Sequence, residues 1–264
     1  MFSIQSFFGS LPQGHESLFS HGQPVWNALK KLKEYLQNFP FEGPLEKMAN
    51  AVPLPRAVVL HNGRLLDEEL EIEYNDATKG KLSVRHRGTA LAGASVIMAG
   101  AVLQGGPIRL GRGVLIESGA LLKGPAVIGD HTEIRQGAYI RGYCLTGARC
   151  VIGHTTEVKH AILLDDAKAG HFAYLGDSIL GNRVNLGAGT KLANLRFHGD
   201  EVRIRTQDDL VETGLRKFGA IMGDDVQTGC NSVTNPGTLL GKGSVLLPNT
   251  TAASGLHGPG TILS

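Results

Sequence analysis

Residues 110–163 read LGRGVL IESGAL LKGPAV IGDHTE IRQGAY IRGYCL TGARCV IGHTTE VKHAIL when they are divided into groups of six. The first position of each group is aliphatic in all but one case, and the fifth is Ala, Cys, Thr or Val in all but the last. An α-helix does not produce this period, because six is far from a whole number of 3.6-residue turns. A triangular coil does, with one short strand on each side and about 18 residues in each turn of about 4.8 Å rise.

The repeat extends well beyond this stretch. It is weaker back to about Ala92, stops at a polar stretch over residues 194–216, and resumes from Met222 to Thr251. Glycine is abundant, with 36 residues, and aromatic residues make up only 6% of the chain, which suits many tight turns around a narrow interior. We therefore expect an all-β chain, in which residues 88–264 form a left-handed parallel β-helix of hexapeptide repeats, with about eight coils and a loop at 194–216.

The first 87 residues lack the repeat. After Pro24 the segment VWNALKKLKEYL places apolar residues on one helical face, which predicts an amphipathic helix that ends before Pro40 and packs on the β-helix or on a neighbouring subunit. The apolar residues of that face are Val25, Leu29, Leu32 and Leu36. Asn62-Gly63, within Ala57–Leu66, is a strong type I′ turn signal and predicts a hairpin. Residues 1–87 are thus expected to form a small N-terminal α/β cap, to which we assign no chemistry.

Charge and cysteine content narrow the class of protein. The formal net charge is +2, too small to indicate binding to nucleic acid or to a membrane surface. Cys144, Cys150 and Cys230 form neither a CxxC motif nor an even set for disulfides, and we interpret them as reduced thiols. The sequence shows no signal peptide and no apolar run long enough to span a membrane. A cytoplasmic protein with no nucleic-acid or membrane partner is expected.

Unusual polar residues gather where the repeat is irregular. They occur in EVKHA (157–161), GHFAYLGD (170–177), NLGAGT (185–190), Asn194 and RKFGA (216–220). A β-helix has flat faces and no deep cleft, so a site that uses these residues is expected where two subunits meet. The flat faces and the spread of these motifs along the chain predict a homotrimer, because threefold packing buries the faces and completes three sites.

These motifs resemble the acetyltransferase domain of the bifunctional bacterial N-acetylglucosamine-1-phosphate uridylyltransferase/glucosamine-1-phosphate acetyltransferase family. That family has EIKKS, NHLTYVGD, NIGAGT, NYDG and NKFKTIIGDD in the same order, and the resemblance covers roughly residues 90–255. The sequence NLR, followed by a long loop and GLRKFGA, is more similar to the archaeal sugar-1-phosphate nucleotidylyltransferase/acetyltransferases.

The resemblance implies a role for each matched residue. His171 matches the position of the catalytic base in that family. Residues that bind the sugar phosphate are Arg141, Lys159 and Lys217, and positions that contact the substrate are Tyr174, Asn185 and Asn194. Ala188 and Cys230 fall on the acetyl-CoA side, and no metal ligand is implied. The chain departs from the family at Leu195, where the family has Tyr, at Cys230, where it has Ser, and in lacking the family's basic C-terminal tail.

The expected activity is therefore acetyl-CoA-dependent N-acetylation of a hexosamine 1-phosphate, either glucosamine 1-phosphate or galactosamine 1-phosphate, in nucleotide-sugar synthesis. Acetyl-CoA is the co-substrate. A histidine suits the removal of a proton from the attacking amine, and Arg and Lys suit the phosphate. The sequence contains no Gly-rich nucleotide loop of the LAAGxGTRM type. Uridylyl transfer is not expected of this chain, and a separate nucleotidylyltransferase is a possible partner.

Other interpretations stay open at this stage. A non-catalytic β-helix that binds a sugar phosphate or nucleotide sugar beside a nucleotidylyltransferase is the main alternative. Acyl transfer from an acyl carrier protein to a UDP-sugar is a second, and a zinc site at His131, His154 and His160 is a third. Each candidate residue also has an ordinary structural interpretation, as a solvated charge or as a polar residue at a turn.

Overall fold

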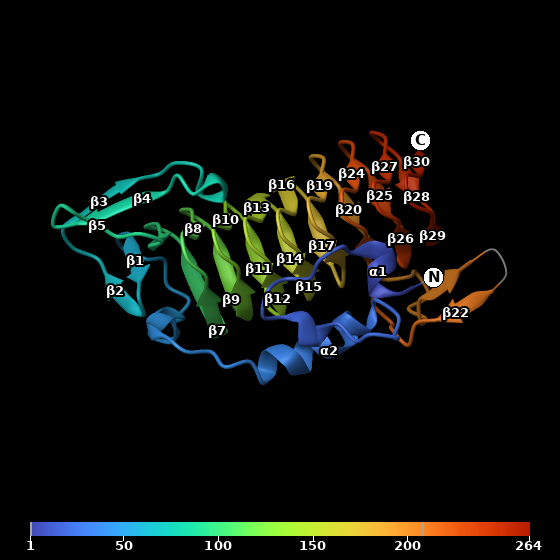
Figure 1. Cartoon of the computed structure of the whole chain (residues 1–264), viewed down its shortest axis with the longest axis horizontal. Coiled ribbons are helices and arrows are strands. Elements are labelled where there is room, and N and C mark those ends of the chain that lie inside the picture. Colours follow the sequence, from blue (N-terminus) through green and yellow to red (C-terminus); the bar gives the residue numbers. More distant parts are fainter. Residues whose placement is uncertain (1, 207–208) are drawn as a thin grey trace.

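The computed structural model describes residues 2–206 and 209–264, and it confirms the predicted fold class. Nine strands of the described chain stack in parallel along one face of an elongated β-helix (Figure 1). About eight coils were predicted, and the ninth strand is β30 (Ile262–Leu263), which lies beyond Thr251, where the predicted repeat ends. The N-terminal residues lie along the side of the β-helix and across the end of its first coil.

Each coil contributes a strand to each of three faces, which we number in the order in which the chain meets them. The first face holds β6 (Ser95–Ile97), β8 (Leu115–Ile116), β10 (Glu133–Ile134), β13 (Val151–His154), β16 (Lys168–His171), β19 (Asn185–Leu186), β24 (Gln227–Thr228), β27 (Val245–Leu246) and β30 (Ile262–Leu263). The second face holds β11 (Tyr139–Arg141), β14 (Glu157–Lys159), β17 (Tyr174–Gly176), β20 (Lys191–Leu192), β25 (Val233–Thr234) and β28 (Thr251–Ala252). The third face holds β12 (Cys144–Thr146), β15 (Ala161–Leu163), β18 (Ile179–Leu180), β23 (Ala220–Met222), β26 (Thr238–Leu240) and β29 (Gly255–His257). The long strands β7 (Val102–Leu110) and β9 (Leu121–Ile128) continue from the second face onto the third.

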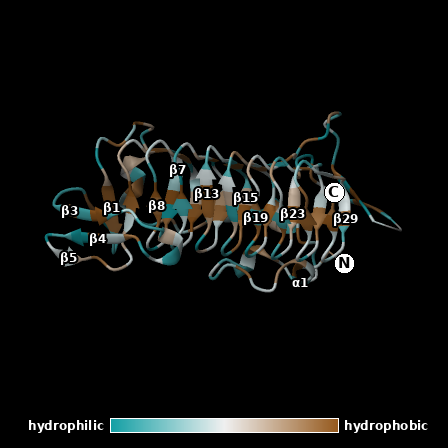
Figure 2. Ribbon diagram, turned by 90° about the horizontal axis from the view of Figure 1, so that it is seen from above, coloured by the Kyte–Doolittle hydropathy of each residue, from teal (hydrophilic) through white to brown (hydrophobic). Residues whose placement is uncertain are grey.

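The strand register explains both the repeat and its irregularities. Glu133 pairs with Val151 and Val151 pairs with Lys168, so the coil that begins at Val151 is shorter than the coil before it by a single residue. The coil from Lys168 to Asn185 has the same reduced length, and these two shorter coils account for the slips in the six-residue period. Aliphatic and small side chains from the first and fifth positions fill the interior, and hydrophilic residues concentrate in the loops (Figure 2). The interior is therefore a continuous apolar column.

The N-terminal residues cover the third face. The predicted amphipathic helix is α2 (Asn27–Gln37), and all four apolar residues of its predicted face are buried. It packs near the short 3-10 helix η1 (Glu16–Leu18) and shares a cluster with α1 (Ile4–Phe7), whereas a further 3-10 helix, η2 (Pro44–Met48), contacts β7. Phe7, Trp26 and Leu32 share a buried cluster with outward-facing side chains of the third face such as Ile162 and Leu239. Of the two packing partners predicted for this helix, the β-helix or a neighbouring subunit, the structure shows the β-helix. The division of the chain at residues 87 and 88 stays a prediction. No helix of the described residues is long and apolar enough to cross a membrane.

Residues 58–90 close the N-terminal end of the β-helix. The predicted hairpin forms from β1 (Val58–His61) and β2 (Arg64–Leu66), with positive φ at both Asn62 and Gly63, as a type I′ turn requires. β1 pairs antiparallel with β6 and so extends the first face. The next residues form β3 (Leu70–Glu73), the 3-10 helix η3 (Ala77–Lys79), β4 (Ser83–His86) and β5 (Thr89–Ala90), in a separate three-stranded antiparallel sheet.

The loop at 194–216 leaves the β-helix, most of its described residues are exposed, and it contains two antiparallel strands. Its strands are β21 (Arg203–Arg205) and β22 (Leu210–Glu212). Val202 and Ile204 are fully buried in the same cluster as Leu239 of the third face. The sequence is polar overall, but these two alternating apolar residues fix the hairpin to its own chain.

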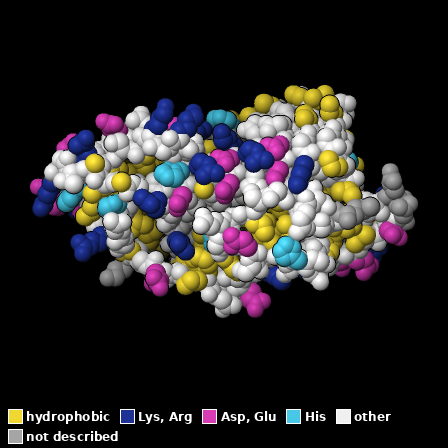
Figure 3. Space-filling view, viewed as in Figure 1, with side chains coloured by type: hydrophobic (Ala, Val, Ile, Leu, Met, Phe, Trp, Pro, Cys, Tyr) yellow, Lys and Arg dark blue, Asp and Glu magenta, His cyan; other side chains and the backbone are white. Residues whose placement is uncertain are grey.

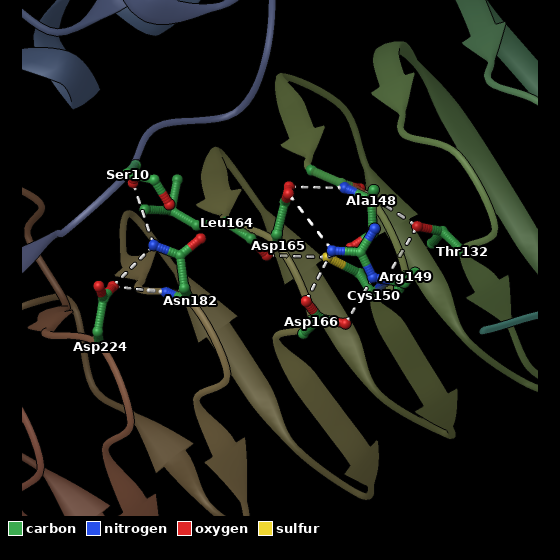
Figure 4. A network of polar contacts seen from close by, with 11 residues as sticks. Ser10, Thr132, Ala148, Arg149, Cys150, Leu164, Asp165, Asp166, Asn182 and Asp224 are labelled. Carbon is green, nitrogen blue, oxygen red and sulfur yellow. Dashed lines mark hydrogen bonds and ion pairs between the residues drawn. The ribbon is translucent and has the colours of Figure 1, made fainter. Parts of the chain in front are cut away.

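A buried carboxylate holds the N-terminal segment against the third face (Figure 4). Asp224, which is 4% exposed, accepts hydrogen bonds from the backbone N–H of Gly9 at 2.7 Å and of Asn182 at 2.8 Å. The side-chain amide of Asn182 donates to Asp224 at 2.9 Å and to the carbonyl oxygen of Ser10 at 3.1 Å. These bonds join the chain at residues 9–10 to two coils of the β-helix.

We predict that Asp224→Asn destabilises the protein by about 2 kcal/mol, because an amide group cannot accept all of these hydrogen bonds and leaves a buried donor unpaired. The matched control is Asp225→Asn, since Asp225 pairs with Arg183 at 2.7 Å and both side chains are more than half exposed. An exposed pair of this kind contributes less than about 1 kcal/mol. Chemical denaturation measures both effects, and equal stability of the two variants would contradict this account of the N-terminal segment.

Candidate functional site

Four of the candidate residues lie close together on the second face or at its edge. Arg141, Lys159 and Tyr174 come from β11, β14 and β17, and each side chain points outward because the residue next to it in its strand is buried. Asn194 follows β20 in the next coil. Charged side chains of both signs lie across the middle of the molecule (Figure 3). The parallel register thus brings together residues that are far apart in the sequence, from Arg141 to Asn194.

The charges in this cluster are partly paired. Arg141 Nη1 donates to Glu157 Oε1 at 2.6 Å, and both side chains are partly exposed. This hydrogen bond raises the pKa of the Arg141 guanidinium. Burial, together with the nearby carboxylates of Glu157 and Asp177, raises the pKa of the Tyr174 phenol. Tyr174 is thus kept as a neutral hydroxyl group beside a fixed cation, whose remaining N–H groups are available to an anionic ligand.

A network of hydrogen-bonded side chains next to these residues was not predicted from the sequence. Asp177, which is 6% exposed, accepts from His160 Nδ1 at 2.8 Å and from Asn194 Nδ2 at 2.5 Å. The Asn194 Oδ1 atom then faces the Tyr174 hydroxyl at 3.5 Å. Gly176 leaves space for the Asn194 side chain, because a Cβ atom at position 176 would lie 2.5 Å from Asn194 Nδ2. His160 and Asp177 belong to the EVKHA and GHFAYLGD motifs, so the signal was present although neither residue was assigned a role.

Three further candidates form a row along the corner between the first and second faces. The backbone N–H of Gly189 donates to the carbonyl of His171 at 3.0 Å, and that of Asn231 donates to the carbonyl of Ala188 at 2.8 Å. His171, Ala188 and Cys230 therefore occupy the same position in three successive coils. The His171 and Cys230 side chains are exposed, and the ring of Phe172 lies near the rings of both His171 and His154.

Two candidates lie apart from the second-face cluster. Asn185 is exposed on the first face, so its side chain points away from Arg141, Lys159 and Tyr174. Lys217 is exposed at the base of the 194–216 hairpin, where its backbone pairs with Leu195 and the N–H of Phe218 donates to Asn194 at 2.9 Å. A single chain thus brings Lys217 to the edge of the cluster but leaves Asn185 on a different face.

The three histidines considered for zinc lie at different corners of the prism. His131 precedes a first-face strand, His154 ends one, and His160 follows a second-face strand. Over the residues 2–206 and 209–264, no group of three or more His, Cys, Asp or Glu side chains is placed to hold a metal ion.

Comparisons with known proteins place the similarity on the β-helix. Residues 122–240 match the model of the GMPPB C-terminal domain. A bifunctional sugar-1-phosphate nucleotidylyltransferase/acetyltransferase of Sulfurisphaera tokodaii is 39% identical over 97 residues, which are 37% of this chain and 24% of that protein. The bifunctional protein GlmU of Methanocaldococcus jannaschii is 41% identical over 90 residues, which are 34% of this chain and 22% of that protein.

A solved structure of the Francisella novicida UDP-N-acetylglucosamine acyltransferase aligns with a TM-score of 0.45 and 14% identity, over 59% of this chain and 58% of that one. The matches span about a quarter of the length of the curated relatives. Within that span the resemblance predicted from the sequence is confirmed: this chain is similar to a segment of the bifunctional sugar-1-phosphate nucleotidylyltransferase/acetyltransferases, including the archaeal enzyme of Sulfurisphaera tokodaii.

Proposed function

We propose that this chain is an acetyl-CoA-dependent N-acetyltransferase that acts on a hexosamine 1-phosphate. The observation that carries the proposal is the grouping of Arg141, Lys159, Tyr174 and Asn194 on and beside the second face, one corner away from His171. The similarity to segments of proteins named nucleotidylyltransferase/acetyltransferase supports it. The hexosamine is glucosamine 1-phosphate or galactosamine 1-phosphate, and the product serves nucleotide-sugar synthesis.

His171 acts as the general base in this proposal. The amine of the sugar attacks the thioester carbonyl, a C–N bond forms, and the C–S bond breaks to release CoA as a thiolate. His171 removes the proton that the nitrogen loses, a role suited to an imidazole at neutral pH. Its exposed position at the corner between two faces leaves it accessible to both substrates. No covalent enzyme intermediate is needed, because the thiolate is already a good leaving group.

Arg141, Lys159 and Lys217 bind the phosphate of the acceptor. The acceptor carries about two negative charges, and guanidinium and ammonium groups bind such anions through charge-assisted hydrogen bonds. Glu157 uses one N–H group of Arg141, which leaves other donors for the phosphate. Tyr174, Asn185 and Asn194 contact the sugar. Asp177 keeps Asn194 oriented with its amide oxygen toward Tyr174.

We also propose a homotrimer in which the first face of one subunit meets the second face of the next. The chain's own N-terminal segment covers the third face, which leaves these two faces for neighbours. Such a contact would bring Asn185 of one subunit to the Arg141 cluster of another, as a closed heterologous ring permits. Leu247 and Ile262, which follow or belong to first-face strands of the C-terminal coils, are exposed and add apolar surface there. A separate nucleotidylyltransferase is the proposed partner for uridylyl transfer.

Two substitutions test the assigned roles. We predict that His171→Ala lowers kcat by about two to four powers of ten and changes the KM for the sugar phosphate little, because the base acts only on a proton that moves in the reaction. Lys217→Ala should mainly raise the KM for the sugar phosphate, because the phosphate contact exists before and during the reaction. Steady-state release of the CoA thiol measures both constants, and unchanged kcat in folded His171→Ala protein would show that another residue is the base.

The reactivity of the three cysteine thiols tests independently whether Cys230 lies at the proposed acetyl-CoA site. Burial raises the pKa of Cys144 to about 12 and also raises that of Cys150, whereas Cys230 is exposed. Iodoacetamide should therefore modify Cys230 alone in the native protein, because only the accessible thiolate reacts. We predict that acetyl-CoA slows this modification severalfold, as peptide mass spectrometry would show. An unchanged rate at saturating acetyl-CoA would remove Cys230 from the proposed donor site.

A further inference from the structure

A small basic cavity lies between the 194–216 hairpin and the C-terminal coils. Its volume is about 240 Å³, and six residues line it: Arg196, Arg203, Arg205, Leu210, Pro236 and Ser254. Three of these six described residues are arginines and none carries a carboxylate. Three guanidinium groups around one cavity create a strongly positive potential and a set of planar N–H donors, an arrangement suited to phosphate groups.

The backbone around the three arginines is held against the β-helix, while their side chains are exposed. Arg203 and Arg205 flank the buried Ile204 in β21, so both side chains point to the same side of the hairpin. Gly237 and Gly255 let β21 approach the β-helix closely. A Cβ atom at Gly237 would lie 2.6 Å from Val202, and one at Gly255 would lie 2.8 Å from the Arg205 carbonyl oxygen. Arg196 Nη1 donates to the carbonyl of Glu201 at 3.2 Å, which holds that side chain across the base of the hairpin.

One carboxylate forms an ion pair with an arginine of the cavity. Glu212 lies 3.6 Å from Arg203, and both side chains are at least half exposed. Water and salt weaken such a pair, so it does not neutralise three cations. The cavity is open, as expected for a site that receives one end of a long ligand.

The cavity lies at the corner between the second and third faces, across the second face from the proposed acyl-donor residues. Pro236 belongs to the same coil as Cys230, and Ser254 belongs to the next coil toward the C-terminus. His171 lies two coils before Cys230. The distance along the axis from the His171 coil to the Ser254 coil is therefore about three strand spacings, or roughly 14 Å. Between the Cys230 corner and the cavity runs the second face, where Val233 and Thr251 form a floor of small side chains in β25 and β28.

We propose that Arg196, Arg203 and Arg205 bind the phosphate groups of the CoA portion of the acyl donor. CoA carries a 3′-phosphate and a diphosphate at the end opposite its thioester, so an extended donor with its thioester at His171 lies diagonally across the second face and reaches the cavity with its phosphates. This inference rests on the proposed acetyl transfer, and it assigns the hairpin a role in donor recognition.

The test compares two acetyl donors in the variant Arg203→Ala/Arg205→Ala. With acetyl-CoA, the KM should rise about a hundredfold, roughly tenfold for each arginine that loses a charge-assisted hydrogen bond. With S-acetyl-N-acetylcysteamine, which has the same thioester but no phosphate, kcat/KM should not change. The KM for the hexosamine 1-phosphate should also stay the same. Arg64→Ala, an exposed arginine of β2 at the other end of the molecule, is the matched control and should leave all three constants unchanged.

Calorimetry with CoA alone and with 3′,5′-ADP separates this inference from the proposed function, because binding needs no catalysis. Tighter binding to the wild-type protein than to the double variant, weakened by added salt, supports the site even if no acetyl transfer occurs. Equal affinity of the two proteins for CoA would overturn it. A rise in the KM for the sugar phosphate, with that for acetyl-CoA unchanged, would also overturn it and assign the cavity to the acceptor. Matching thermal melting curves of the variants establish that the effects do not come from unfolding.

Discussion

Each coil of this protein is hydrogen-bonded to the coil before it at a nearly constant separation along the sequence, except where the hairpin intervenes. This register is the constraint on which the site depends, because it converts a position in the six-residue repeat into a position in space. Residues at the same corner of successive coils form a row, and outward-facing residues of one face form a sheet of side chains. His171, Ala188 and Cys230 are aligned for that reason, and Arg141, Lys159 and Tyr174 share a face for the same reason.

The N-terminal segment makes the three faces unequal. By burying Phe7, Trp26 and α2 against the third face, it removes that face from contact with other molecules. Asp224 and Asn182 hold the segment in place through backbone and amide groups near Gly9 and Ser10. The two remaining faces carry the candidate residues, with Asn185 on the first and the Arg141 cluster on the second. In the proposed trimer this asymmetry decides which surfaces face a neighbouring subunit.

Local patterns in the sequence predicted much of this structure. The repeat predicted the coils, Asn62-Gly63 predicted the hairpin, and the spacing of Leu29, Leu32 and Leu36 predicted α2, because each depends on residues close together in the chain. The path of residues 2–22 over the third face was not predictable, since Phe7 and Phe8 show no period and their burial depends on coils far away in sequence. The hydrogen-bond network of His160, Asp177 and Asn194 was not predicted, because it links the corners of three coils and no local sequence pattern reveals such a link.

In the proposed trimer, residues of the first face and of the second face complete one site across a subunit contact. This shared site is tested most directly by mixing two inactive proteins and reassembling them together. Arg141→Ala/Lys159→Ala disables the second face, and Asn185→Asp places a repelling carboxylate on the first. In randomly mixed rings, roughly a quarter of the contacts pair an intact first face with an intact second face. The account predicts that acetyl transfer returns to about that fraction of the wild-type rate. Activity that stays at the average of the two parent proteins, in trimers shown to contain both, would contradict it.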